Sequence, residues 1–235
     1  MFRREHRGEH WISISDVMSG LMAIFLFVSV AFMLDVLREK DKIKQIAITY
    51  ARLQDDLYND LYEEFKYDLP KWNAELDRKT LAVRFKEPEV LFERGKAELK
   101  PKFEEILKDF FPRYIEILTR FKYKDEISEI RIEGHTSSEW SGASTGDEAY
   151  LQNMILSHER ARKVLEFVLF LSEIKPKKEW VKKHIMAAGF SSSRLILSPS
   201  GKEDKYRSRR VEFRVITNAE KRIFKIIKEE EDETS

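Results

Sequence analysis

The stretch that decides the fold is VMSGLMAIFLFVSVAFML, from Val17 to Leu34, which runs for 18 residues without a charge. All 43 Lys and Arg and all 42 Asp and Glu lie elsewhere in the 235-residue chain. At about 1.5 Å per residue a helix of this length spans roughly 27 Å, close to the ~30 Å hydrocarbon core of a bilayer. The simplest interpretation is one transmembrane helix over residues 11–35, with Trp11 as an interfacial aromatic.

Two other interpretations of the run stay open, a buried core helix and a cleaved signal peptide that leaves a secreted protein. Ser29 and Ala31 would supply the small residues of a cleavage site. Asp16 argues against a signal peptide, because export signals place basic residues at this point. Whether the N-terminal segment is cleaved decides between a signal peptide and a helix that stays in the protein.

The charges around the run do not orient it, because basic residues flank both ends. Arg3, Arg4 and Arg7 precede the span, and a comparable basic group follows it: Arg38, Lys40, Lys42 and Lys44. A short tail such as residues 1–10 usually stays in the cytoplasm while a long C-terminal part is translocated. We therefore expect a cytoplasmic N-terminus and a translocated C-terminal part.

The leading edge of the run carries a carboxylate at the head of a stripe of small or polar side chains. Helical steps of three and four place these residues on one face: Ser13, Asp16, Ser19, Gly20 and Ala23. Small residues let another helix approach closely, and a carboxylate at membrane depth needs a partner, water or an ion path. Asp16 is therefore a candidate ion carrier that loads and releases a proton; the alternative is an N-cap at the membrane surface.

The composition excludes several functions. The absence of cysteine removes disulfides, thiolate zinc sites, Cys nucleophiles and iron–sulfur clusters, and the net charge of +1 argues against a general nucleic-acid binder. No two of the five histidines stand at helical spacing with a third ligand nearby, so no metal site is expected: His6, His10, His135, His158 and His184. No GxSxG elbow or phosphate loop is present, so we expect neither a soluble enzyme nor a resident cofactor.

The rest of the chain divides into three parts. Residues 36–79 are rich in charge and keep a helical apolar period, which predicts a helical connector broken near Pro70. This connector would pair with a second copy or pack on the following domain. Residues 80–218 predict a compact α/β domain, and residues 219–235 a charged tail that ends in EEEDE.

Alternating patterns within the domain predict its elements. Strands are expected where β-branched residues alternate: Leu81–Phe85, Glu126–Gly134 and Arg210–Ile216. Helices are expected over the amphipathic segments: Pro101–Phe121, Leu151–Leu171 and Glu179–His184. The domain is long enough to hold its own core.

Five motifs of the domain resemble, in order and approximate spacing, the OmpA-like peptidoglycan-binding domain. They are FERGKAELKP (Phe92–Pro101), IEGHTSS (Ile132–Ser138), NMILSHERA (Asn153–Ala161), AAGFSSSRLI (Ala187–Ile196) and SRRVEFRV (Ser208–Val215). The resemblance covers residues 81–216. Such a domain behind one N-terminal span that begins with an aspartate resembles the B subunits of ion-driven stator motors, and most closely those of the Zorya anti-phage defence motor.

The resemblance implies a motor in the bacterial inner membrane, with a single span, a cytoplasmic N-terminus and a periplasmic C-terminal domain. In that family two B chains stand inside a ring of five polytopic A subunits (MotA-like or ZorA-like), and ion flow past the B-chain aspartate drives rotation. The matching residue here is Asp16, the ion is a proton or alternatively sodium, and the wall domain anchors the dimer to peptidoglycan. The alternatives are a flagellar-type stator subunit for motility and a passive wall tether.

The resemblance also implies a wall-binding site: Ser137, Asn153, Leu156, Arg160 and Arg209. In the family an aspartate after the GHT sequence holds the ammonium of diaminopimelate and an arginine holds its carboxylate. Arg160 matches the arginine, but Ser137 replaces the aspartate, and an insertion follows over residues 138–148. We expect Asp147 or Glu148 to supply the missing charge, or a different or weaker mode of binding. Without the resemblance, Arg160 would be a surface arginine that caps a helix or pairs with Glu133 or Glu159.

Overall fold

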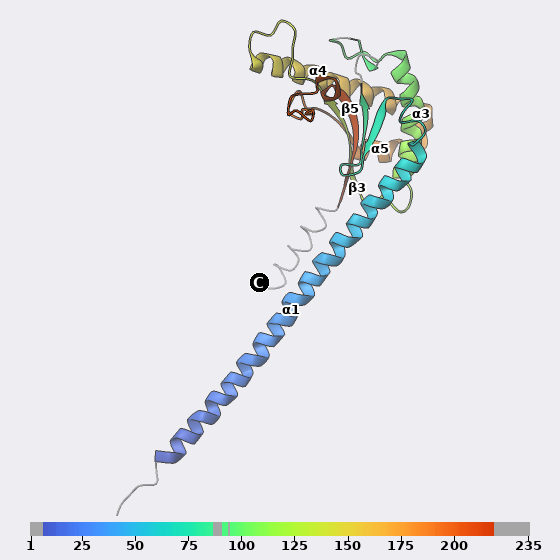
Figure 1. Ribbon diagram of the computed structural model, residues 1–235. Helices are drawn as coiled ribbons and strands as arrows, with labels where there is room; N and C mark the ends of the chain where they lie inside the picture. Colours follow the sequence, from blue (N-terminus) through green and yellow to red (C-terminus); the bar gives the residue numbers. More distant parts are fainter. Residues whose placement is uncertain (1–6, 87–90, 94, 219–235) are drawn as a thin grey trace, which may run out of the picture. The chain divides into compact units, whose positions relative to one another are not determined.

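The computed structural model describes residues 7–86, 91–93 and 95–218, with side chains from Ser15 onward, and is drawn in Figure 1. The expected tail of residues 219–235 and the first six residues lie outside this part. The chain divides into two units, Met1–Tyr50 and Ala51–Ser235. Helix α1, from Arg7 to Phe65, contributes to both.

The first unit is the N-terminal part of α1, which contains the uncharged run. Among the described residues this is the one helix long and apolar enough to cross a membrane, and none of its most apolar window is buried. Phe25, Phe27 and Phe32 are each at least 70% exposed. A core helix would bury these rings, so the interpretation of the run as a core helix is wrong.

A five-stranded sheet forms the centre of the second unit, in the order β1-β2-β5-β3-β4. Its strands are β1 (Ala74–Asp77), β2 (Ala82–Lys86), β3 (Ile127–His135), β4 (Ile185–Gly189) and β5 (Arg210–Thr217). β3 and β4 are parallel and the other pairs antiparallel. Because side chains alternate along a strand, one face of the sheet is apolar, with Ile132 beside Phe213, and the other is charged, with Glu133 beside Glu212.

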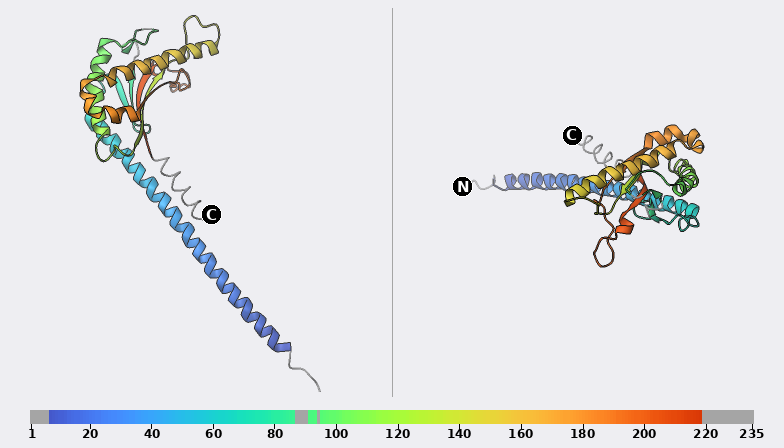
Figure 2. Two further views of the ribbon diagram at one scale, coloured as in Figure 1. Left: turned by 180° about the vertical axis from the view of Figure 1, so that it is seen from behind. Right: turned by 90° about the horizontal axis from the view of Figure 1, so that it is seen from above.

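Helices cover the apolar face of the sheet (Figure 1). They are α3 (Pro101–Leu118), α4 (Gly146–Leu169) and α5 (Lys178–His184), with the short η1 (Ser172–Lys177) between the last two. A further short helix, α6 (Lys205–Ser208), precedes β5. Aromatic rings fill the core beneath α3, where Phe110 lies 5.2 Å from Phe85 and 5.1 Å from Phe213 between ring centroids. Figure 2 shows α4 lying across the sheet from two further directions.

The last turns of α1 are part of this domain. Leu57, Leu61 and Phe65 follow one another at steps of four and are at most 1% exposed in the core. Charged pairs fasten the same turns to α3 and the loop after it: Arg113 Nε to Glu64 at 2.7 Å, Arg120 to Asp60 at 3.1 Å and Lys122 to Asp56 at 2.7 Å. The segment expected as a connector, residues 36–79, therefore divides, because the compact unit begins at Ala51 and includes β1.

Most expected elements form within a few residues of their predicted bounds. The exceptions are β1 and β4, which the sequence analysis did not predict, and α4, which begins at Gly146 instead of Leu151. β1 (AELD) and β4 (IMAAG) are four and five residues long and lack a β-branched alternation. Their pairing partners, β2 and β3, hold them in the sheet.

Candidate functional site

A cavity of about 640 Å³ lies where the loop after β3 meets α4 and the start of β5. All five residues that the sequence analysis assigned to wall binding line it: Ser137, Asn153, Leu156, Arg160 and Arg209. The other lining residues are Gly95, Thr136, Glu139, Trp140, Ser141, Ala143, Thr145 and Ala149. The tertiary structure thus brings together residues that stand more than seventy positions apart in the sequence.

Helix α4 presents three of these residues because of their spacing. Asn153, Leu156 and Arg160 stand at i, i+3 and i+7, so they share one helical face. The helix is capped by Thr145, whose side chain accepts a hydrogen bond from the Glu148 backbone N–H at 3.2 Å. The Glu148 carboxylate in turn accepts from the Ser144 N–H at 2.8 Å.

This capping arrangement corrects one expectation. Asp147 and Glu148 do not line the cavity, because they form the first turn of α4, where carboxylates favour the helix dipole. The T-x-x-E sequence from Thr145 to Glu148 is the signal that would have placed the helix start there. Neither residue supplies the charge that the family aspartate would bring.

Glu139 is the one carboxylate among the described residues that line the cavity, and the sequence analysis did not single it out. It pairs with Lys205, and the hydrogen bond from this lysine lowers the pKa of the carboxyl group. Glu139 lies two residues after Ser137, in the loop that replaces the family sequence. The cavity therefore has an acidic group, but at a different position from that of the family.

Asn153 fixes this loop against α4. It is 3% exposed, and its amide Nδ2 donates to the carbonyl oxygens of Ser137 at 3.2 Å and Glu139 at 3.1 Å. Two backbone carbonyls on one buried amide hold the loop in place, since breaking either bond would leave a buried polar group unpaired. Asn153 thus positions the loop.

Arg160 is buried without an acidic partner among the described residues. Only 6% of it is exposed; its Nε donates to the Lys96 carbonyl at 2.9 Å, and the guanidinium lies 4.9 Å from the centroid of the Phe92 ring. Burial first, and the nearby Arg209 second, lower the pKa of Arg160 to about 10, so it stays charged at neutral pH. The expected alternative, pairing with Glu133 or Glu159, does not occur.

Arg209, just before β5, and Arg210, its first residue, have different surroundings. Arg209 lines the cavity, and its buried Nε has no hydrogen-bond partner in the described part of the chain. Arg210 instead donates through Nε to Glu212 at 2.5 Å, on the charged face of the sheet. Neither Arg160 nor Arg209 forms a salt bridge in the described part of the chain, although the charge of Arg209 contributes to lowering the pKa of Glu139. Two such guanidinium groups suit a carboxylate or another anion.

Buried acids on the charged face of the sheet form a separate cluster. Ligand atoms of Glu133, His135 and Glu212 lie within 4.8 Å of one another. Five arginines already pair with the two carboxylates: Arg84 and Arg210 with Glu212, Arg131 and Arg194 with Glu133, and Arg214 with both. A metal ion would be repelled by these guanidinium groups, so the cluster serves the fold.

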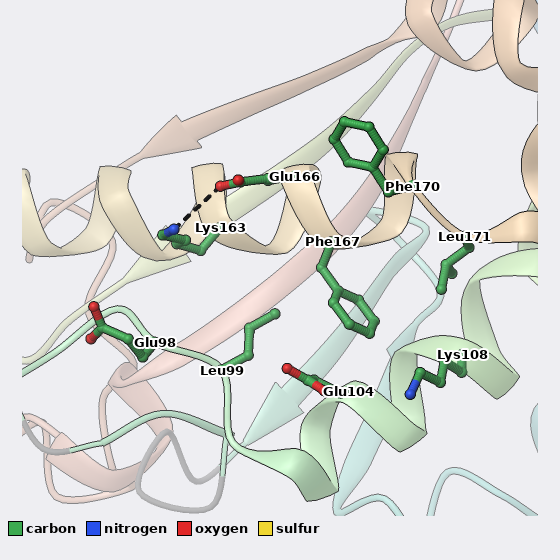
Figure 3. Close-up of a pocket in the computed structure, with 9 residues that line it drawn as sticks. All are labelled: Glu98, Leu99, Glu104, Lys108, Lys163, Glu166, Phe167, Phe170 and Leu171. Carbon is green, nitrogen blue, oxygen red and sulfur yellow. Dashed lines mark ion pairs between the residues drawn. The ribbon is translucent and has the colours of Figure 1, made fainter.

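A second cavity, of about 520 Å³, lies between α3 and α4 and is shown in Figure 3. Leu99, Phe167, Phe170 and Leu171 form its apolar part, with glutamates and lysines around them. Lys163 and Glu166, which pair at 3.3 Å, lie on its rim. None of the residues predicted for wall binding lines this cavity.

Asp16 lies inside α1, which begins at Arg7, so it is not the N-cap of this helix. The helical backbone keeps Asp16, Ser19, Gly20 and Ala23 on one face, and all four are exposed in the single chain. A Cβ atom added at Gly20 would meet no atom within 4 Å. The stripe is therefore a surface to which another helix has access.

Residues 91–209 match the OmpA family. The chain is 51% identical to Zorya protein ZorB of Escherichia coli strain Crooks over 227 residues, which are 97% of this chain and 96% of that protein.

Solved structures with a similar fold include a MotB-like protein from Desulfovibrio vulgaris (24% identity, 71% of this chain and 94% of that chain, TM-score 0.48). The periplasmic domain of Helicobacter pylori MotB is also similar (16% identity, 67% of this chain and 90% of that chain, TM-score 0.45).

Proposed function

The chain belongs to the OmpA family and to the ZorB family of Zorya proteins, and from this premise we propose that it is the ion-carrying, wall-anchored subunit of a rotary motor in anti-phage defence. The observation that carries the proposal is that the identity to ZorB covers 97% of the chain. It therefore includes both the helix with Asp16 and the domain with the arginine cavity. A flagellar-type stator subunit would also need an ion-carrying helix and a wall-binding domain, but it would not need this level of sequence identity to ZorB.

In this proposal α1 crosses the inner membrane once. The N-terminus is cytoplasmic and the domain is periplasmic, where it meets peptidoglycan. Two copies stand inside a ring of five polytopic ZorA-like or MotA-like subunits, and the stripe headed by Asp16 faces that ring. The exposed small residues support this contact, since they allow close approach of a second helix.

Asp16 carries the ion, a proton or alternatively sodium. Each unit charge that moves through 100 mV releases about 2.3 kcal/mol, which is the energy available for rotation. An aspartate that takes up a proton from one side and releases it to the other couples this energy to movement of the A ring.

The test of this role is Asp16→Asn, which keeps the size of the side chain but cannot exchange a proton. We expect the variant to copurify with the membrane partner at the wild-type level and to lose protection against phage by at least a hundredfold in plaque counts. Asp35→Asn, at the other end of the run, is the control and should retain protection. Full protection by the Asp16 variant would contradict the ion-carrier role.

The cavity is proposed to bind the diaminopimelate of the peptide stem. Arg160 and Arg209 hold its carboxylate, because they are the two cationic side chains that line the cavity and neither forms a salt bridge among the described residues. Glu139 receives the ammonium group in place of the family aspartate and exchanges its bond to Lys205 for one to the ligand. Paired opposite charges at the two ends suit a zwitterion.

Cosedimentation of the detergent-solubilised full chain with purified peptidoglycan sacculi tests this site. Arg160→Ala should lower binding at least tenfold, about 1.4 kcal/mol or more. Arg162→Ala is a matched control on the same helix, since Arg162 is exposed and pairs only with Glu159 and Glu166 among the described residues. Equal binding by the two variants would contradict the assignment of Arg160.

A further inference from the structure

Trp140 differs from the other tryptophans whose side chains are described. Trp72 packs 5.9 Å from Phe65 between ring centroids, and Trp180 stacks on His184 at 4.4 Å. Trp140 is half-buried and lines the cavity, and within the described part of the chain no aromatic ring or cation lies against it. A large ring in a cavity without a ring partner is an available apolar face.

The loop that carries Trp140 is held at several points. The Ala143 N–H donates to the Trp140 carbonyl at 3.3 Å, and Asn153 bonds the carbonyl of the residue before it. On the other side of Glu139, the Ser138 N–H and hydroxyl donate to Glu203 at 3.0 and 2.5 Å. The backbone of the loop that carries the ring is therefore held in place before any ligand arrives, which lowers the entropic cost of ordering this loop on binding.

Hydroxyl groups line the same cavity. Ser137, Ser141 and Thr145 line it with Trp140, and Thr136, only 4% exposed, has a buried hydroxyl without a partner among the described residues. A buried hydroxyl without a partner is costly unless a ligand or water meets it. The cavity of about 640 Å³ also has the size that holds drug-sized ligands, larger than one amino acid.

We propose that Trp140 and these hydroxyls form a saccharide subsite next to the arginines. A sugar ring has C–H faces that pack on an aromatic ring and hydroxyls that bond to serine and threonine. The ligand is then an N-acetylated sugar of the glycan strand joined to the peptide that Arg160 holds. This inference rests on the proposed binding of peptidoglycan and adds recognition of the glycan strand to it.

Calorimetric titration of the detergent-solubilised full chain with two probes tests the subsite. The probes are N-acetylglucosaminyl-N-acetylmuramyl tripeptide, which ends in diaminopimelate, and the same tripeptide without sugars. We expect the wild type to prefer the glycosylated probe about fivefold to tenfold, the scale of one aromatic contact. Trp140→Leu should lose this preference and keep its affinity for the free tripeptide, whereas Trp140→Phe should keep most of the preference.

The outcomes separate the two proposals. A wild type that binds both probes equally, or a Trp140→Leu variant that keeps the preference, overturns the saccharide subsite. Equal losses for both probes in Trp140→Leu also overturn it, because Trp140 then supports the fold. If Arg160→Ala binds the free tripeptide as the wild type does, the wall-binding proposal fails instead, while the sugar preference is still read from Trp140→Leu.

Discussion

At the scale of single residues, buried charge is the costliest feature of the domain. Glu133 and Glu212 are fully buried and stand directly opposite each other on β3 and β5. Two unpaired carboxylates at this distance would repel each other, and burial would favour their neutral forms. Arginines from β2, β5 and the loop before α6 offset both effects. Removing one of these charges would therefore destabilise the domain, because it would leave another buried charge without its partner.

Glu212 makes this argument testable. Burial alone would raise the pKa of its carboxyl group, but Arg210 and Arg84 outweigh burial and lower it below the ordinary 4.5. A lowered pKa in the folded state means stabilisation that is present above pH 4.5 and lost as the pH falls through the folded value. Glu212→Gln should therefore cost about 3 kcal/mol in the free energy of unfolding at pH 7, and less at acidic pH.

This difference is measured by urea unfolding of the full chain in detergent, with the near-ultraviolet circular dichroism of the aromatic core as the signal. The control is Glu159→Gln, since Glu159 pairs with Arg162 at the surface and should change stability by less than about 0.5 kcal/mol. If the difference in free energy of unfolding between wild type and Glu212→Gln stays constant from pH 7 to pH 3, the stabilisation does not come from the ionised carboxylate of Glu212.

At the scale of elements, the approach of α4 to the sheet decides where the site residues lie. Two glycines face this helix: a Cβ on Gly134 would meet the Ser157 carbonyl oxygen at 2.1 Å, and a Cβ on Gly189 would meet the His158 nitrogen at 2.5 Å. Both contacts are with backbone, which cannot move without shifting the helix. Close packing here carries Asn153 and Arg160 to the cavity.

Gly134→Ala should therefore destabilise the domain by about 3 kcal/mol, because the added methyl group pushes α4 away from β3. The matched control is Gly146→Ala in the first turn of α4, where a Cβ meets no atom within 4 Å. Alanine there should be neutral or stabilising by up to about 1 kcal/mol. Thermal unfolding of both variants measures the difference, and equal melting temperatures would contradict this account.

At the scale of the whole molecule, the chain combines an exposed apolar segment of α1, residues 17–34, with a domain that holds its own core. Leu21, Phe25 and Phe32 are exposed in the single chain, as are the small residues of the stripe. Lipid can cover the first group, but the second fits the close approach of another helix. The two faces should therefore respond differently to substitution.

Replacing Ser19, Gly20 and Ala23 together by leucine should abolish copurification with the polytopic partner and phage protection. Replacing Phe25 and Phe32 by leucine should preserve both, because lipid accepts either side chain. Membrane fractionation and copurification measure the outcome. If both variants retain partner binding and protection, the helix is only an anchor and the passive tether is the better account.

The sequence by itself determined the local features of this protein. An uncharged run of membrane length, the position of Asp16 and the helical spacing of Asn153, Leu156 and Arg160 all follow from short-range periodicity. The motifs that resemble the OmpA-like domain also contain residues that line the cavity.

Only the tertiary structure decided the features that depend on pairing between distant segments. β1 and β4 form because β2 and β3 offer hydrogen-bonding edges, although their own sequences carry little strand signal. Glu139 and Trp140 reach the cavity because Asn153 bonds their loop, while Thr145 draws Asp147 and Glu148 into the helix. Periodicity reports which face of its own element a side chain occupies, and only packing decides what that face meets.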